Sequence, residues 1–265
     1  MKNKILYQVD SFTNTPFKGN PAGVMILDME TSSDWMQQIA TEMNLSETAF
    51  ITPNGDNFNI RFFTPTKEVP LCGHATLASG HIIYELGLRK QNETIRLQAQ
   101  EDLLTLHKDG DCITMTFPKY PLKKIDIPNR FQEIVGFTPV EIYESKYKWV
   151  LALAENENII KSLQPNIEPM KANELGHLMV TAKSDQNNID FVVRCFVPWM
   201  GIDEDPVTGS AQCALVPYWH MKTGKNEFNS LQVSKRTGEL MVALKENSVI
   251  IQGKAITVFK IECLF

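Results

Sequence analysis

The sequence predicts an α+β fold with two similar domains, each of which wraps strands around one central helix. Three observations predict it: short apolar strands recur along the chain, one order of motifs occurs twice, and each copy includes a helix without formally charged side chains. A length of 265 residues is enough for two compact domains that each bury their own core.

Apolar runs bounded by turn residues predict strands through the first half of the chain. One segment among them, Ser33–Met43, has helical spacing instead, with Ser32 or Ser33 available as the N-cap. The predicted strands are Ile5–Val9, Gly23–Leu27, Thr48–Thr52, Asn59–Phe63, Thr94–Ala99, Leu103–His107 and Ile113–Phe117.

A stretch rich in proline and lysine, from Pro118 to Pro128, ends this first series of strands. A second series begins near Phe131. We therefore expect a first domain over residues 1–118 and a second over residues 119–254. The last strand, 255–265, is free to return to the first domain.

The order strand, loop, glycine and helix occurs once in each half. Arg61 to Pro65 (R-F-F-T-P) matches Arg194 to Pro198 (R-C-F-V-P). After a loop that is three residues longer in the second copy, Gly73 to Ala78 matches Gly209 to Ala214. The alternative is that these are two ordinary core helices with an accidental similarity.

Both helices of the repeat have an unusual composition. Neither His74–Tyr84 nor Ser210–Met221 contains a formally charged side chain. Because a helix without a charged face is buried on all sides, each is expected at the centre of its domain. Pro217 is expected to kink or locally break the second helix.

The N-terminus of a helix attracts anions through its unpaired backbone N–H groups and its partial positive charge. A glycine at that point lets a ligand approach the backbone closely. If the two halves face each other, the amides of Gly73-His74 and Gly209-Ser210 point into one cleft from opposite sides. That arrangement predicts a site for a carboxylate.

Several titratable residues lie near these helix starts, and for each an ordinary structural role remains open. Acids beside a helix N-terminus can simply complement its dipole or cap it. Glu47, at the start of an apolar strand, is either a catalytic group or a structural one that ends the preceding helix or forms a surface ion pair. Cys72 can be a small buried hydrophobe. The other candidates are Glu68, His74, Asp203, Glu204 and Asp205.

Composition and missing motifs exclude other classes of function. The net charge of −5 gives no reason to expect nucleic acid or an anionic membrane as a partner. Five scattered cysteines without paired spacing suit a reducing compartment, so we expect a cytoplasmic protein. His81 and His107 have no metal-ligand spacing to another histidine or cysteine, and no metal is expected. Nucleotide-binding, phosphate-binding and serine-hydrolase motifs are missing as well.

Four motifs, in order, resemble the phenazine-biosynthesis PhzF-like proteins, whose fold is similar to that of the diaminopimelate epimerase superfamily. The resemblance implies two pseudo-symmetric domains, each an antiparallel barrel-like sheet around a central helix, and a cofactor-free active site between them. The motifs span most of the chain: Val9 to Phe12 with Phe17 to Ala22 (F-K-G-N-P-A), Asn44 to Phe50 (N-L-S-E-T-A-F), Phe63 to Ala78, and Asp203 to Ala211 (D-E-D-P-V-T-G-S-A).

Carried over to this sequence, the resemblance implies roles for individual residues. Glu47 is the expected proton-shuttling acid and base, and His74 and Asp205 are expected to polarise or position the substrate. The remaining residues expected to bind substrate are Asn20, Cys72, Gly73, Gly209 and Ser210. The family commonly forms dimers, so a homodimer is expected.

The predicted function is therefore a cofactor-independent isomerase that moves a proton on a small carboxylated metabolite. One alternative is an epimerase that inverts a single carbon with Cys72 and an acidic partner. A symmetrical two-thiol racemase is disfavoured, because the second copy of the repeat has no cysteine before its glycine. Another alternative is a protein that binds small acids without turnover.

Overall fold

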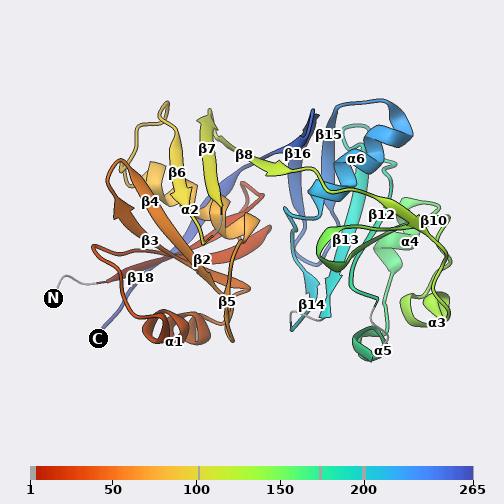
Figure 1. The fold of residues 1–265 in the computed structure, drawn as a ribbon, viewed down its shortest axis with the longest axis horizontal. Coiled ribbons are helices and arrows are strands. Elements are labelled where there is room, and N and C mark those ends of the chain that lie inside the picture. The colour runs from red at the N-terminus through yellow and green to blue at the C-terminus, as the bar shows by residue number, and fades with distance from the viewer. Residues whose placement is uncertain (1–3, 101, 173–174, 199–200, 265) are drawn as a thin grey trace. The chain divides into compact units, whose positions relative to one another are not determined.

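The computed structural model of the chain describes residues 4–100, 102–172, 175–198 and 201–264. Two compact units divide it: Met1–Thr116 with Gln252–Phe265, and Phe117–Ile251. These boundaries differ by two or three residues from the expected 1–118 and 119–254. The last strand lies in the first unit, where it pairs with the first strand of the chain (Figure 1).

The first unit is a mixed sheet in the order β18-β1-β2-β3-β4-β6-β7-β8, with short β5 beside β4. Neighbours are antiparallel except for β2–β3 and β4–β6, which are parallel. Helix α1 (Ser33–Met43) makes the crossover between β2 and β3, and its N-cap Ser32 accepts a hydrogen bond from the Trp35 amide. The strands are β1 Ile5–Ser11, β2 Asn20–Ile26, β3 Glu47–Asn54, β4 Asn57–Phe63, β5 Glu68–Val69, β6 Ile95–Gln98, β7 Leu103–Asp109, β8 Cys112–Pro118 and β18 Ala255–Glu262.

Helix α2 (Gly73–Glu85) is the central helix of this unit, as its uncharged composition predicts. It packs on β1, β2, β3 and β18. Its opposite side meets β7, because a Cβ added at Gly80 would lie only 2.5 Å from a methyl group of Leu106. Glycine at position 80 therefore permits strands to surround the helix closely.

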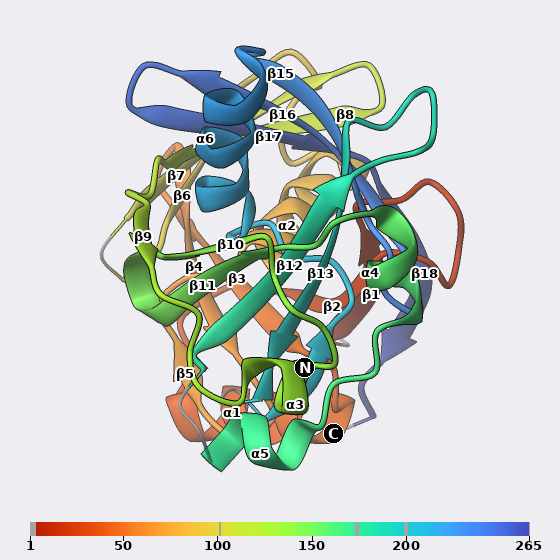
Figure 2. The same ribbon diagram turned by 90° about the vertical axis from the view of Figure 1, so that its right-hand side faces the viewer.

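The second unit repeats this plan (Figure 2). Its sheet order is β9-β10-β11-β12-β13-β15-β16, with β14 also on β13, and its parallel pairs are β11–β12 and β13–β15. The strands are β9 Lys123–Ile125, β10 Glu141–Glu144, β11 Trp149–Leu153, β12 His177–Lys183, β13 Phe191–Val197, β14 Ile202–Asp205, β15 Glu227–Gln232, β16 Gly238–Lys245 and β17 Ser248–Gly253. The helices are α3 Phe131–Val135, the 3₁₀ turn η1 Lys146–Lys148, α4 Glu157–Ser162, α5 Ile167–Ala172 and α6 Gln212–Thr223.

Helix α6 is the central helix of the second unit. The ring of Trp219 stacks on Phe191 of β13, and its Nε1 donates to Thr181 of β12. Of the two effects expected of Pro217, a kink or a local break, the break is wrong, because one helix runs through this residue. Proline has no N–H to donate to the carbonyl four residues earlier, and that carbonyl, of Cys213, accepts the Tyr120 amide at 2.9 Å instead.

The start of α6 also differs from the expectation. The sequence predicts a helix from Ser210, whereas α6 begins at Gln212. Gly209 and Ser210 lie in a tighter turn, in which their carbonyls accept the amides of Gln212 and Cys213 three residues later. Such bonds satisfy first-turn groups without extending the α-helix.

The topology confirms the internal repeat and the predicted fold class. Each unit contains the same sequence of antiparallel and parallel pairings, with its central helix inserted at the same point, before β6 in one and before β15 in the other. The barrel-like sheets are mainly antiparallel, as expected, but each also contains two parallel strand pairs. Within the described residues, no helix combines the length and apolar character that crossing a membrane requires.

Candidate active site

The first unit gathers polar side chains at the N-terminus of α2. Asn20 and Glu47 are the first residues of β2 and β3, and these neighbouring strands run parallel. Both strands therefore begin at the same edge of the sheet. His74 is the second residue of α2 and is buried, with only 6% of its surface exposed. Ser11 fixes the backbone there by donating to the His74 carbonyl at 2.8 Å.

His74 links Asn20 and Glu47 through its two ring nitrogens. Nδ1 lies 3.1 Å from Asn20 Nδ2, and Nε2 lies 3.2 Å from Glu47 Oε2. Because an amide nitrogen only donates, Nδ1 is the acceptor and the ring proton is on Nε2. Nε2–H therefore donates to the Glu47 carboxylate. The amide of Asn20 fixes the tautomer that makes this hydrogen bond.

Burial keeps the His74 ring neutral. Desolvation lowers the pKa of His74 to about 3, so the imidazole is uncharged near neutral pH. The contact with Glu47 is thus a hydrogen bond from a neutral ring to a carboxylate. It orients the carboxylate without transferring a proton to His74.

Cys72 directly precedes α2 and is buried beside the same ring. Its Sγ lies 3.4 Å from His74 Nδ1, and its carbonyl accepts from the Thr76 amide. The Cys72 side chain does not cap the helix, whose first-turn amides have no partners within the helix itself. A neutral imidazole provides no positive charge to favour a thiolate at this position.

Glu47, Cys72 and His74 offer three ligand atoms within 4.8 Å of one another, which is a possible cation site by distance. Both nitrogens of the His74 ring, however, already take part in hydrogen bonds with Asn20 and Glu47. A metal would have to displace one of them. That the protein needs no metal stays a prediction, which elemental analysis of the purified protein can check.

The second unit holds the other expected site residues. Asp205 ends β14, and its Oδ2 accepts from Thr208 Oγ1 at 2.5 Å. Gln232 donates to the Asp205 carbonyl at 2.6 Å and accepts from the Thr208 amide at 2.9 Å. The Gln232 side chain therefore holds the segment before Gly209 at two points, Asp205 and Thr208.

The expected site residues thus form two groups. Asn20, Glu47, Cys72, Gly73 and His74 come together in the first unit, and Asp205, Gly209 and Ser210 lie along one segment of the second. That both groups face one ligand stays a prediction.

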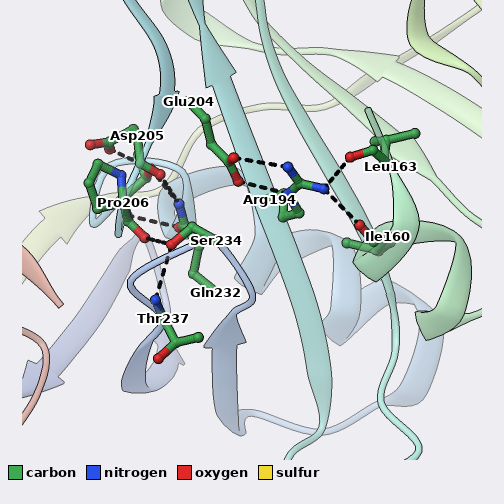
Figure 3. Close-up of polar contacts among 10 residues, drawn as sticks. Ile160, Leu163, Arg194, Glu204, Asp205, Pro206, Gln232, Ser234 and Thr237 are labelled. Carbon is green, nitrogen blue, oxygen red and sulfur yellow. Dashed lines mark hydrogen bonds and ion pairs between the residues drawn. The ribbon is translucent and has the colours of Figure 1, made fainter. Parts of the chain in front are cut away.

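A pair of matching ion pairs was missed by the sequence reasoning. Arg61 binds both oxygens of Glu68 through Nε and Nη2, and Arg194 binds Glu204 in the same way (Figure 3). Each glutamate stands five residues before the repeat glycine, in E-V-P-L-C-G and E-D-P-V-T-G. In this shared E-x-P-x-x-G pattern, Cys72 and Thr208 occupy matching sequence positions. The pattern also locates the three additional residues before Glu204.

Comparisons with known proteins agree with this architecture. The family model described as phenazine biosynthesis-like protein matches residues 9–261. An uncharacterized isomerase of Halalkalibacterium halodurans is 42% identical, with 98% of each chain covered. A crystal structure of a phenazine biosynthesis PhzF family protein from Enterococcus faecalis superposes with a TM-score of 0.94 at 36% identity, covering 99% of this chain and 100% of that one. A hydroxyproline epimerase from Agrobacterium vitis shares the fold, with a TM-score of 0.68 at 11% identity, and 98% and 92% covered.

Proposed function

This chain belongs to the phenazine biosynthesis-like family, and on that premise we propose that it is a cofactor-independent isomerase that moves a proton on a small carboxylated metabolite. Its general class is that of isomerases. The observation that supports the proton-shift reaction is the chain of hydrogen bonds Asn20–His74–Glu47. It presents one oriented carboxylate at the N-terminus of a buried helix.

In the proposed mechanism Glu47 takes a proton from one carbon of the substrate and returns it to another carbon on the same face. A positioned general base of this kind contributes about 10² to 10⁴ in rate. His74 holds the carboxylate through Nε2–H, and Asn20 holds His74. All the proton movement therefore passes through one side chain, and the product is an isomer.

Removal of the proton leaves negative charge on the substrate, which requires fixed donors. The first-turn amides of α2, beginning at Gly73, provide them, aided by the helix dipole. One well-placed donor of this kind is worth about 3 kcal/mol in a transition state. In the proposal, the turn at Gly209 and Ser210 supplies further donors from the second unit.

One observation favours a second candidate, inversion at a single carbon. Cys72 Sγ lies beside the same ring as Glu47, 3.4 Å from His74 Nδ1. In that reaction Cys72 acts on one face of the carbon, and Glu47 or Asp205 acts on the other. The thiol would then be essential, whereas in the proton-shift reaction it is not.

Deuterium uptake tests the proposal. The enzyme is incubated in D₂O with a panel of small carboxylic acids that carry an activated C–H bond, and exchange is followed by NMR. We expect Glu47→Gln to slow exchange by about 10² to 10⁴. The matched control Glu42→Gln, at an exposed residue of α1, should exchange like wild type.

Two outcomes oppose the proposal. Wild-type exchange in Glu47→Gln would show that another group carries the proton. Tight binding of panel members without any exchange in the wild type would instead favour a protein that binds small acids without turnover.

A further inference from the structure

The pairing register identifies His177 as the counterpart of Glu47 in the second unit. Phe63 and Phe196 match in the repeat, and they pair with Thr48 and Leu178. The residue before each of these partners is Glu47 in β3 and His177 in β12. Each is the first residue of its strand, and each strand runs parallel to the one before it.

His177 also faces the central helix of its unit. Side chains alternate along a strand, so His177 shares a face with Thr181. Thr181 Oγ1 accepts a hydrogen bond from Trp219 of α6 at 3.1 Å. The intervening Leu178 and Val180 belong to the core cluster on the other face. Glu47 likewise contacts the central helix of the first unit through His74.

The backbone and a neighbouring ring hold His177 in place. Gly176 has a φ of +72°, and a Cβ there would lie 2.2 Å from the Lys148 carbonyl oxygen, so only glycine fits before His177. The His177 ring packs on the buried ring of Trp149, with centroids 5.3 Å apart. Gly176 and Trp149 therefore fix the position of the His177 ring.

One ring nitrogen of His177 is left without a partner. Nδ1 is buried and has no hydrogen-bond partner among the described residues. Burial, and secondly the charge of Lys148, lower the pKa of His177, so the ring is neutral near pH 7. An unpaired buried polar atom is costly, and a ligand can satisfy it.

We propose that His177 is a substrate-binding residue of the second unit and hydrogen-bonds a carboxylate group of the ligand. The neutral ring can place its proton on Nδ1 and donate it, and the positive charge of Lys148 favours an anionic acceptor. The proposal deepens the proposed function and rests on its carboxylate substrate.

The test uses the full chain labelled with ¹³C in its histidine rings. Sodium benzoate, and separately sodium acetate, is titrated at constant ionic strength. The His177 ring resonance is the one missing from the spectrum of His177→Asn. We expect it to shift saturably in the wild type, and we expect benzoate to bind about tenfold more weakly to His177→Asn and His177→Gln, the effect of one lost hydrogen bond to a charged group.

His220→Asn is the matched control, because His220 lies in the same unit and its Nδ1 already contacts the Lys225 carbonyl at 2.9 Å. It should bind benzoate like wild type. The proposal is overturned if the His177 resonance does not shift with either acid, or if both His177 variants keep wild-type affinity. If circular dichroism shows that both variants misfold, the shift of the His177 resonance in the wild type decides whether the proposal holds.

The outcome is separable from that of the proposed function. Glu47→Gln is expected to lose exchange and keep the benzoate-dependent shift of His177. Normal exchange in Glu47→Gln with that shift intact would remove only the proposed proton shuttle. If Glu47→Gln exchanges slowly but the His177 resonance does not shift with either acid, only the proposed role of His177 is removed.

Discussion

Oε2 of Glu47 lies 3.2 Å from Nε2 of His74, although the two residues come from a strand and a helix far apart in the sequence. The imidazole is neutral, so this contact orients a carboxylate without neutralising it. In this geometry Glu47 is the proposed base, and His74 only orients it. Asn20, Cys72 and His74 can therefore be tested for different effects.

Replacement of Asn20 by Ala should weaken the tautomer preference of His74. Without the Asn20 amide, Nδ1 loses a donor and the ring orients Glu47 less firmly, although the Glu47 carboxylate still favours a proton on Nε2. We expect deuterium exchange to slow by about tenfold, the equivalent of one hydrogen bond to a charged group. The ¹⁵N shifts of the His74 ring should move away from the Nε2–H tautomer. Unchanged ring shifts would show that Asn20 does not position His74.

Replacement of Cys72 by Ala distinguishes the two reactions. In the proton-shift mechanism the thiol is a buried neighbour of His74, so the exchange rate should stay within about threefold of the wild-type rate. Cys72→Ser, in which a hydroxyl replaces the thiol, should exchange at a similar rate. Loss of exchange by about 10² or more in both variants would identify the thiol as a base and support inversion at one carbon.

The burial of His74 predicts a specific dependence of stability on pH. Its pKa falls from 6.5 in the unfolded chain to about 3 in the folded protein. Between these values the unfolded state binds more protons, so the free energy of unfolding decreases as pH falls, by at most about 1.4 kcal/mol per pH unit for this group.

Urea unfolding at several pH values from 7 to 4 measures this effect. The variant His74→Gln should lose that part of the slope, whereas His107→Asn, at an exposed position of β7, should keep the wild-type slope. If His74→Gln and the wild type show parallel curves, His74 is not the group that resists protonation.

The two repeated arginines should differ in their effect on stability. Arg194 Nη1 also donates to the carbonyls of Ile160 and Leu163, whereas among the described residues Arg61 Nη2 adds one hydrogen bond beyond its glutamate, to the exposed Ser33. The Arg194 side chain is 13% exposed and that of Arg61 is 23% exposed. We expect Arg194→Met to lower the free energy of unfolding by about 2 kcal/mol and Arg61→Met by about 1 kcal/mol. Equal losses in urea unfolding would contradict the additional role of the two carbonyls.

The sequence predicts the central helices and most strands because burial leaves a direct pattern. An uncharged helix such as α2 has few alternatives to the centre of a domain. Strand direction leaves no such pattern, so the parallel pairing of β2 with β3 was not predictable from alternation. The segment that leads into α6 is held by Gln232, whose side chain accepts from the Thr208 amide, 24 residues away. Such a distant contact cannot be found from local propensity.

The candidate site was predictable in part for the same reason. Glu47 stands out because a carboxylate has no role in an apolar strand, and the motif places His74 beside a glycine. His177 carries no such signal, since a histidine before an apolar strand is commonplace. It is found only when the register of β12 with β13 is known and compared with that of β3 with β4.

The return of β18 to pair with β1 has a consequence for biosynthesis. The ribosome completes the second unit, a continuous segment, before it releases the residues that finish the first. One edge of β1 therefore stays unpaired until β18, Ala255–Glu262, has emerged from the ribosome. Nascent chains that stop short of Gln252 should expose that edge to chaperones or to other chains, even with the second unit already folded.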